Sequence, residues 1–130
     1  MLTVISPAKR LNEKPHPLTE GLSVGTPRFS KEATELARLA RGLSVAELCG
    51  LMDISPKLGE LNRDRFRSFD PKAPGQPAVF LFDGDTYAGL EARQMEPDAL
   101  RWAAGHLRIL SGLYGLLRPF DGIQPYRLEM

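Results

Sequence analysis

Two short, strongly apolar runs constrain the fold of this chain more than any other feature. The first, Leu2–Ile5, contains β-branched residues and ends at Ser6-Pro7, where proline cannot donate into a sheet. The second, Ala78–Phe82, is apolar at every position and ends at Asp83-Gly84-Asp85. A continuous apolar run bounded by turn residues is typical of a strand buried on both faces. We therefore predict two buried strands, each followed by a polar loop.

Four helical segments are predicted around these strands. Each combines apolar residues at helical spacing with a start signal, such as a capping serine or a proline in the first turn. The four expected helices run from Ser30 to Gly42, from Ser44 to about Met52, from Ser55 to about Arg67, and from Pro97 to Ser111. This order of elements predicts an α/β or α+β fold, with a mixed sheet covered by helices, in which residues 1–130 form a single domain.

The composition is that of an ordinary soluble globular protein. The formal net charge is +1 over 130 residues, and 42% of the residues are hydrophobic. No apolar run approaches the ~20 residues needed to span a bilayer, and the lone Cys49 fits a reducing compartment. We expect a cytoplasmic protein with no membrane partner. The sequence stops at Leu128-Glu129-Met130 in mid-pattern, which suggests a fragment whose missing half would complete the sheet.

The segment from Arg108 to Pro119 has the strongest signs of a binding function. A helical pattern leads into Gly112 and Gly115, and Arg118 follows shortly afterwards. Glycines at a turn let backbone N–H groups approach an anion closely, and an arginine binds phosphate or carboxylate through its planar fork. This outline resembles a helix-hairpin-helix element, which binds DNA phosphates without reading bases. An ordinary helix end followed by a loop is the alternative.

Polar loops after the two expected strands form a second candidate site. If the strands are parallel neighbours, Ser6-Pro7-Ala8-Lys9 and Asp83-Gly84-Asp85-Thr86-Tyr87 open at the same sheet edge. Lys9 and Asp85 could then face each other. The alternative is that Lys9 is a solvated lysine and that Asp83 and Asp85 are turn formers.

No cofactor motif is present. The sequence contains no CxxC, no G-x-G-x-x-G, no P-loop and no pair of histidines at metal-binding spacing. His106 has Leu110 at the position where a second ligand would stand, and Cys49 lies in an apolar helix. We therefore predict no cofactor and no metal site, and the scarcity of ligands argues against stable iron binding by these residues.

Several blocks of the sequence resemble the YaaA family of bacterial peroxide-stress proteins. The resemblance extends over nearly the whole chain and rests on Ile5–Lys9, Met52–Leu58 with Asn62 and Arg65-Phe66, Gly84–Leu90, His106–Gly115, and Arg118-Pro119 through Pro125–Met130. Members of this family are roughly twice as long, so the resemblance implies that this chain is the N-terminal half of a longer single-domain protein. The family is associated with limiting damage from unincorporated iron. A member has been described as a DNA-binding protein with a helix-hairpin-helix element and a positively charged cleft.

The resemblance also implies a set of functional positions. DNA or phosphate binding is expected from Ser6, Lys9, Gly112, Tyr114, Gly115, Arg118, Tyr126 and Arg127, while Lys9, Tyr87 and Glu129 are candidate catalytic residues. The chain departs from the family pattern at Asp83, where a lysine is expected. This departure weakens a purely electrostatic DNA cleft at that loop.

Two functions remain as hypotheses. The first is a cytosolic peroxide-stress protein that binds duplex or structured DNA through a basic cleft with little sequence preference. The second is an enzyme that acts on a nucleotide, a nucleobase or a DNA lesion and uses Lys9, Tyr87 or Glu129. A nucleotide-like ligand fits either hypothesis.

Overall fold

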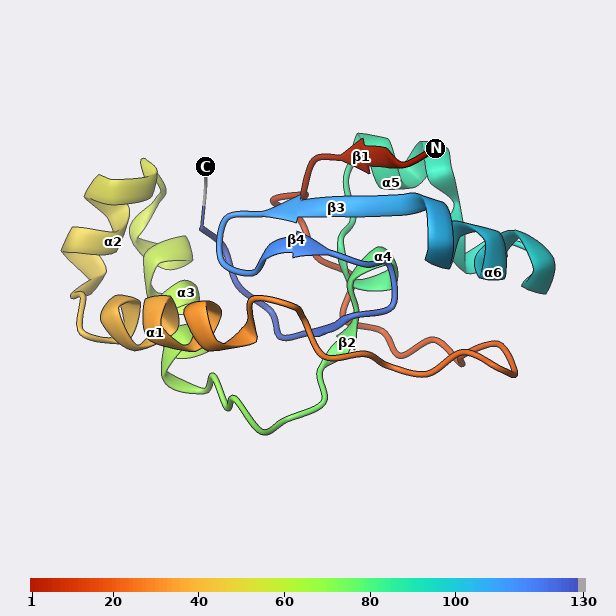
Figure 1. Cartoon of the computed structure of the whole chain (residues 1–130). Helices are drawn as coiled ribbons and strands as arrows, with labels where there is room; N and C mark the ends of the chain where they lie inside the picture. Colours follow the sequence, from red (N-terminus) through yellow and green to blue (C-terminus); the bar gives the residue numbers. More distant parts are fainter. Residues whose placement is uncertain (129–130) are drawn as a thin grey trace.

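The structure is a computed structural model that describes residues 1–128. Glu129, one of the expected catalytic candidates, lies outside the described residues. In chain order the elements are β1 (Thr3–Ile5), α1 (Ser30–Arg41), α2 (Val45–Met52), α3 (Pro56–Arg67), β2 (Gln76–Pro77), α4 (Ala78–Leu81), α5 (Asp85–Leu90), the 3-10 helix η1 (Ala92–Gln94), α6 (Pro97–His106), β3 (Leu107–Ser111), β4 (Gly115–Leu117) and β5 (Gly122–Ile123) (Figure 1).

A small mixed sheet confirms the predicted fold class. Its strand order is β1-β3-β4, with β1 parallel to β3 and β3 antiparallel to β4 (Figure 1). Strands β2 and β5 form a separate antiparallel pair. On β3 the buried residues Leu107, Ile109 and Ser111 alternate with the more exposed Arg108 and Leu110. One face of the sheet therefore points into the core, as the period of two in a strand requires.

The first three helices are confirmed close to their predicted ends. Ser44 and Glu47 form both hydrogen bonds of the expected capping box, and the Ser55 hydroxyl accepts a hydrogen bond from the Leu58 amide. Helix α1 buries a stripe of alanines, Ala33, Ala37 and Ala40. Because small side chains allow close approach, α1 and α2 both pack around α3, at one end of the molecule (Figure 1).

The prediction of a second buried strand is correct about burial and wrong about secondary structure. Residues Ala78–Phe82 are all buried, but Ala78–Leu81 form the short helix α4. The amides of Ala78 and Val79 donate to the carbonyls of Asp121 and Pro119, and the Phe82 amide donates to the Ala78 carbonyl. These bonds satisfy the backbone without a strand partner. An unbroken apolar run has no period that separates a buried strand from a buried helix.

The expected helix to Ser111 and the helix-hairpin-helix-like element are also not found. Helix α6 ends at His106, and the next five residues form β3. Strands β3 and β4 form a β-hairpin, and its turn closes at Gly115, whose φ is +70°. A Cβ at Gly115 would stand 3.1 Å from the Phe29 ring, so glycine suits both the backbone and the packing. Of the apolar residues that continue the helical pattern beyond His106, Leu107 and Ile109 face the core from β3, and Leu110 lies on its outer face.

The long segment between β1 and α1 is irregular, as its prolines and glycines predict. Backbone hydrogen bonds nevertheless fix it at two places, from the Asn12 amide to the Leu81 carbonyl and between Gly25 and residues 120–122. The second contact is a parallel bridge between Gly25 and Asp121.

Among the described residues, no helix combines the length and apolar character that crossing a membrane requires.

Candidate functional site

The two ends of the β3–β4 hairpin separate the predicted site residues into two groups. Strands β1 and β3 are parallel, so the loop after Ile5 and the turn after Ser111 leave the sheet at the same edge. We call this edge, with Ser6, Tyr87, Ser111, Tyr114 and Tyr126, the tyrosine edge. Since β4 runs back antiparallel to β3, Arg118 lies at the opposite end of the hairpin, beside Arg108.

The two polar loops predicted to meet are side by side at the tyrosine edge. The Tyr87 hydroxyl donates to the Ser6 carbonyl at 2.5 Å, and the Asp83 amide donates to the Arg10 carbonyl at 2.9 Å. Leu11 and Phe82 also form an antiparallel bridge. The loops therefore meet through backbone pairing, although the second one follows a helix and not a parallel strand.

Tyr114 and Tyr126 are part of the core. The Tyr126 hydroxyl hydrogen-bonds the Ser111 hydroxyl, which also accepts from the Tyr114 amide at 3.0 Å. The Tyr114 hydroxyl accepts from the Gln124 amide at 2.9 Å, and the two tyrosine rings meet edge-on at 5.6 Å between centroids. Both side chains are buried. Their hydroxyls join the β-hairpin to the segment that follows β5.

Burial raises the pKa of all three tyrosines. It raises the pKa of Tyr114 to about 12, and it raises the pKa of Tyr87 and of Tyr126 above the ordinary value as well. All three phenols are protonated at neutral pH, so Tyr87 is poorly suited to act as a general base. Ser6 and Lys9 are exposed at this edge, and Arg127 is half-buried.

Arg118 is held firmly by a buried acid. Asp121 is 2% exposed and accepts from the Arg118 amide at 2.8 Å, from Nε at 3.0 Å and from Nη2 at 2.9 Å. Nη2 also donates to the Thr26 carbonyl at 3.1 Å. The Arg118 side chain remains 55% exposed. A planar guanidinium fixed along one side can present its other side to a ligand.

Arg118 shares a pocket with two further arginines. This pocket, of about 320 Å³, is lined by Arg28, Arg108, Leu116, Leu117, Arg118 and Asp121, and we call it the arginine pocket. Nη1 of Arg108 donates to the carbonyls of Ala104 and Leu107, which fixes one side of the guanidinium where α6 meets β3. Three cations face one acid that is already paired with Arg118, so the pocket suits an anion.

The sequence indicated this pocket only in part. Arg118 was an expected phosphate ligand, whereas Arg108 was part of a charged segment and Arg28 was missed. Arg28 lies before α1, far from the other two in sequence. The backbone bridge between Gly25 and Asp121 brings its segment beside Arg118. A basic residue in the proline- and glycine-rich loop was the available sign.

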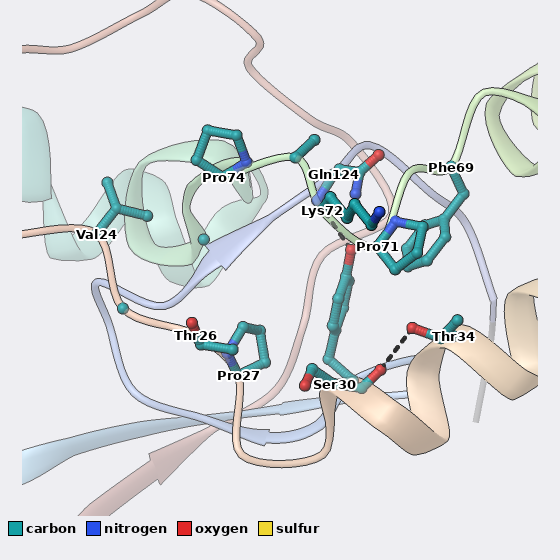
Figure 2. A pocket seen from close by; sticks show the side chains of 14 residues that line it. Val24, Thr26, Pro27, Ser30, Thr34, Phe69, Pro71, Lys72, Pro74 and Gln124 are labelled. Carbon is teal, nitrogen blue, oxygen red and sulfur yellow. Dashed lines mark hydrogen bonds between the residues drawn. The ribbon is translucent and has the colours of Figure 1, made fainter.

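A second pocket, of about 190 Å³, lies on another side of the hairpin. Its lining is mostly neutral and includes Thr26, Ser30, Thr34, Lys72 and Gln124 (Figure 2). The Thr34 hydroxyl donates to the Ser30 carbonyl at 2.8 Å, so this hydroxyl is already engaged.

Among residues 1–128, no group of three or more His, Cys, Asp or Glu side chains is placed to hold a metal ion.

Comparison with known proteins identifies relatives over the whole chain. A family model described as "Peroxide stress protein YaaA" matches residues 1–130. A UPF0246 protein of Cereibacter sphaeroides (strain ATCC 17025) is 60% identical over 132 residues, covering 100% of this chain and 51% of the relative. UPF0246 proteins of Caulobacter vibrioides and Phenylobacterium zucineum are 54% and 50% identical, again over 100% of this chain.

The chain spans about half the length of these curated relatives. The match nevertheless includes both ends of the hairpin, the polar loops and every element of the sheet. This full coverage confirms the family resemblance of the sequence blocks. The chain belongs to the YaaA family of peroxide stress proteins.

Proposed function

We propose that the arginine pocket binds the phosphate backbone of DNA, and that the protein protects DNA during peroxide stress. The single observation that carries this proposal is the convergence of Arg28, Arg108 and Arg118 on one pocket of about 320 Å³. Guanidinium groups bind phosphate oxygens through two parallel N–H donors, which makes arginine the usual residue for this contact. The family description supports the peroxide-stress context.

Binding of this kind has little sequence preference. Phosphate contacts set the position of a protein on DNA and carry no base information. In this proposal the three arginines contact phosphate oxygens and not base edges, beside the apolar lining of Leu116 and Leu117. Duplex or structured DNA is therefore the proposed partner, with affinity that falls as salt rises.

The proposed protection against unincorporated iron acts through DNA. The described residues hold no cluster of metal ligands, and the proposal gives them no role in iron capture. Anaerobic titration of the full-length protein with ferrous iron tests this point. Stoichiometric tight binding that arginine-pocket variants leave unchanged would show a separate iron site and contradict the indirect role.

The enzyme hypothesis has less support. The Tyr87 hydroxyl donates a hydrogen bond to the Ser6 carbonyl, and burial raises the pKa of this phenol. Tyr87 is therefore unsuited to deprotonate a substrate at neutral pH. Lys9 is exposed on the loop after β1. No observation on the described residues favours a particular reaction, and DNA binding is therefore the function proposed.

The test is fluorescence anisotropy with duplex DNA over a salt series, on the full-length protein that contains this chain. Arg28→Gln and Arg108→Gln each remove one cation from the pocket. We expect each to weaken binding about tenfold and to reduce the slope of log affinity against log salt by about one. The matched control is Lys57→Gln, which removes one exposed charge from α3. Equal effects of all three variants would contradict the proposed pocket.

A further inference from the structure

The outer face of the small sheet is apolar and open among the described residues. Register places Val4 beside Arg108 and Leu110 beside Leu116 on the face opposite the core. Leu2, Val4 and Leu110 are 56%, 51% and 41% exposed, and Leu116 is half-buried. Among these outward positions Arg108 is the charged one.

This pattern differs from that of a sheet with one solvated face. Such a sheet alternates apolar residues toward the core with polar residues toward water, whereas a sheet covered on both faces is apolar on both. Here the core side carries Leu107, Ile109 and Leu117, and the outer side carries Val4, Leu110 and Leu116. A sheet of this composition requires a layer on each side.

The open edge of the sheet points to the same conclusion. Strand β1 stands at the end of the strand order and pairs with β3 along one side. It is only three residues long and carries no charged side chain. An exposed apolar edge strand without charges or proline is a site at which another strand can pair.

We propose that the C-terminal half carried by the relatives of this chain covers this outer face and borders the edge of β1. The curated relatives are about twice as long as this chain, which matches 51% of the first of them. That leaves enough polypeptide in the same molecule to form the missing layer. A tethered segment has a high effective concentration, which favours it over a second copy or another protein.

This arrangement places the arginine pocket at the border of the two halves. Arg108 and Leu116 belong to the outer face and also line the pocket. A layer on Val4 and Leu110 therefore ends beside the arginines. The inference does not depend on what the pocket binds, because it rests on the apolar pattern and on the length of the relatives.

The test measures thiol accessibility in the full-length protein. In a Cys49→Ala background, Leu110→Cys reports on the outer face and Asp98→Cys reports on a fully exposed position, since the Asp98 side chain is 100% exposed. We expect maleimide to label the cysteine at 110 at least about tenfold more slowly than that at 98, because labelling requires local opening. Val4→Cys provides a second reporter if the first variant folds poorly.

Two results would overturn the inference. Equal labelling at positions 110 and 98 in the folded protein would show that nothing covers the face. Protection that disappears when the protein is diluted to a monomer would assign the face to a second copy. Protection that is independent of concentration, in a protein shown to be monomeric by light scattering, supports the C-terminal half as the occupant. None of these outcomes involves DNA, so they leave the proposed function to its own test.

Discussion

The two ends of the β3–β4 hairpin use polar residues for opposite purposes. At the tyrosine edge the hydroxyls of Tyr114 and Tyr126 are buried and bonded to the backbone of Gln124 and to Ser111. At the other end, Arg118 is bonded on one side to Asp121 and remains 55% exposed. Polar groups whose hydrogen bonds are used internally stabilise the fold, whereas a fixed and half-exposed cation is available to a ligand.

The difference between the two ends of the hairpin shows that the residues from Ser111 to Tyr126 do not share one function. Family resemblance placed Tyr114, Gly115, Arg118 and Tyr126 together as DNA contacts. In the structure, Gly115 and the two tyrosines serve the hairpin and the core. Arg118 serves both the fold and the pocket.

Arg118→Ala is expected to have the largest effect on stability. It leaves Asp121, which is 2% exposed, without its charged partner, and breaking such a pair costs about 3 kcal/mol. Urea unfolding of the variant measures this loss. Arg28→Ala, at an exposed position, is the control and should cost under about 0.5 kcal/mol. Similar stabilities for the two variants would show that the Asp121 contact does not hold this end of the hairpin.

Tyr126→Phe should reduce the free energy of unfolding by about 1–2 kcal/mol. The change removes the hydroxyl bonded to Ser111 in a buried position and leaves a donor or acceptor unsatisfied. DNA affinity should remain within about twofold. Loss of DNA binding in a variant of normal stability would move the tyrosine edge into the binding site.

Gly115→Ala should cost about 1 kcal/mol. The residue has a φ of +70°, and an added Cβ would stand 3.1 Å from the Phe29 ring, so the strain comes from both backbone and packing. Thermal unfolding measures the change. Gly50→Ala provides a comparison, because a Cβ at that position meets nothing within 4 Å. A Gly115 variant as stable as the Gly50 variant would show that the turn tolerates a side chain.

The last prediction concerns pH and applies only under alkaline conditions. Burial raises the pKa of Tyr114 from 10.0 to about 12 in the folded state. The folded protein therefore holds this proton more tightly than the unfolded chain, so the stabilisation is complete below pH 10 and is lost as pH rises toward 12. Unfolding in urea between pH 8 and pH 12 should show stability falling above about pH 10. Tyr114→Phe should make this dependence less steep and leave the part due to Tyr87 and Tyr126, whose pKa values burial also raises. An unchanged profile would contradict the burial argument.

Sequence reasoning worked where the determining contacts are local. The capping box at Ser44 and the serine–proline pair at Ser55 place α2 and α3 within a residue of their observed starts. It failed at β3, which pairs with the distant β1 and with the neighbouring β4 although its apolar residues continue the helical spacing of α6. The run Ala78–Phe82 has no period, so its burial was predictable and its helical form was not.

The same distinction applies to the site. Arg118 was predictable because its charge lies beside a turn and a proline. Arg28 joins it only through the Gly25–Asp121 bridge, which no spacing in the sequence indicates. The burial of Tyr87 and Tyr126 also depends on tertiary packing, since both rings contact Phe82, which follows α4.

The most direct measurement compares the two ends of the hairpin in one DNA-binding titration at fixed salt. The double variant Arg28→Gln/Arg108→Gln removes two cations from the arginine pocket, and Tyr126→Phe removes one hydroxyl from the tyrosine edge. The account predicts that the double variant loses DNA affinity by at least about thirtyfold while Tyr126→Phe loses less than about twofold. Full affinity in the double variant, with its fold intact by circular dichroism, would contradict the assignment of DNA binding to the arginine pocket.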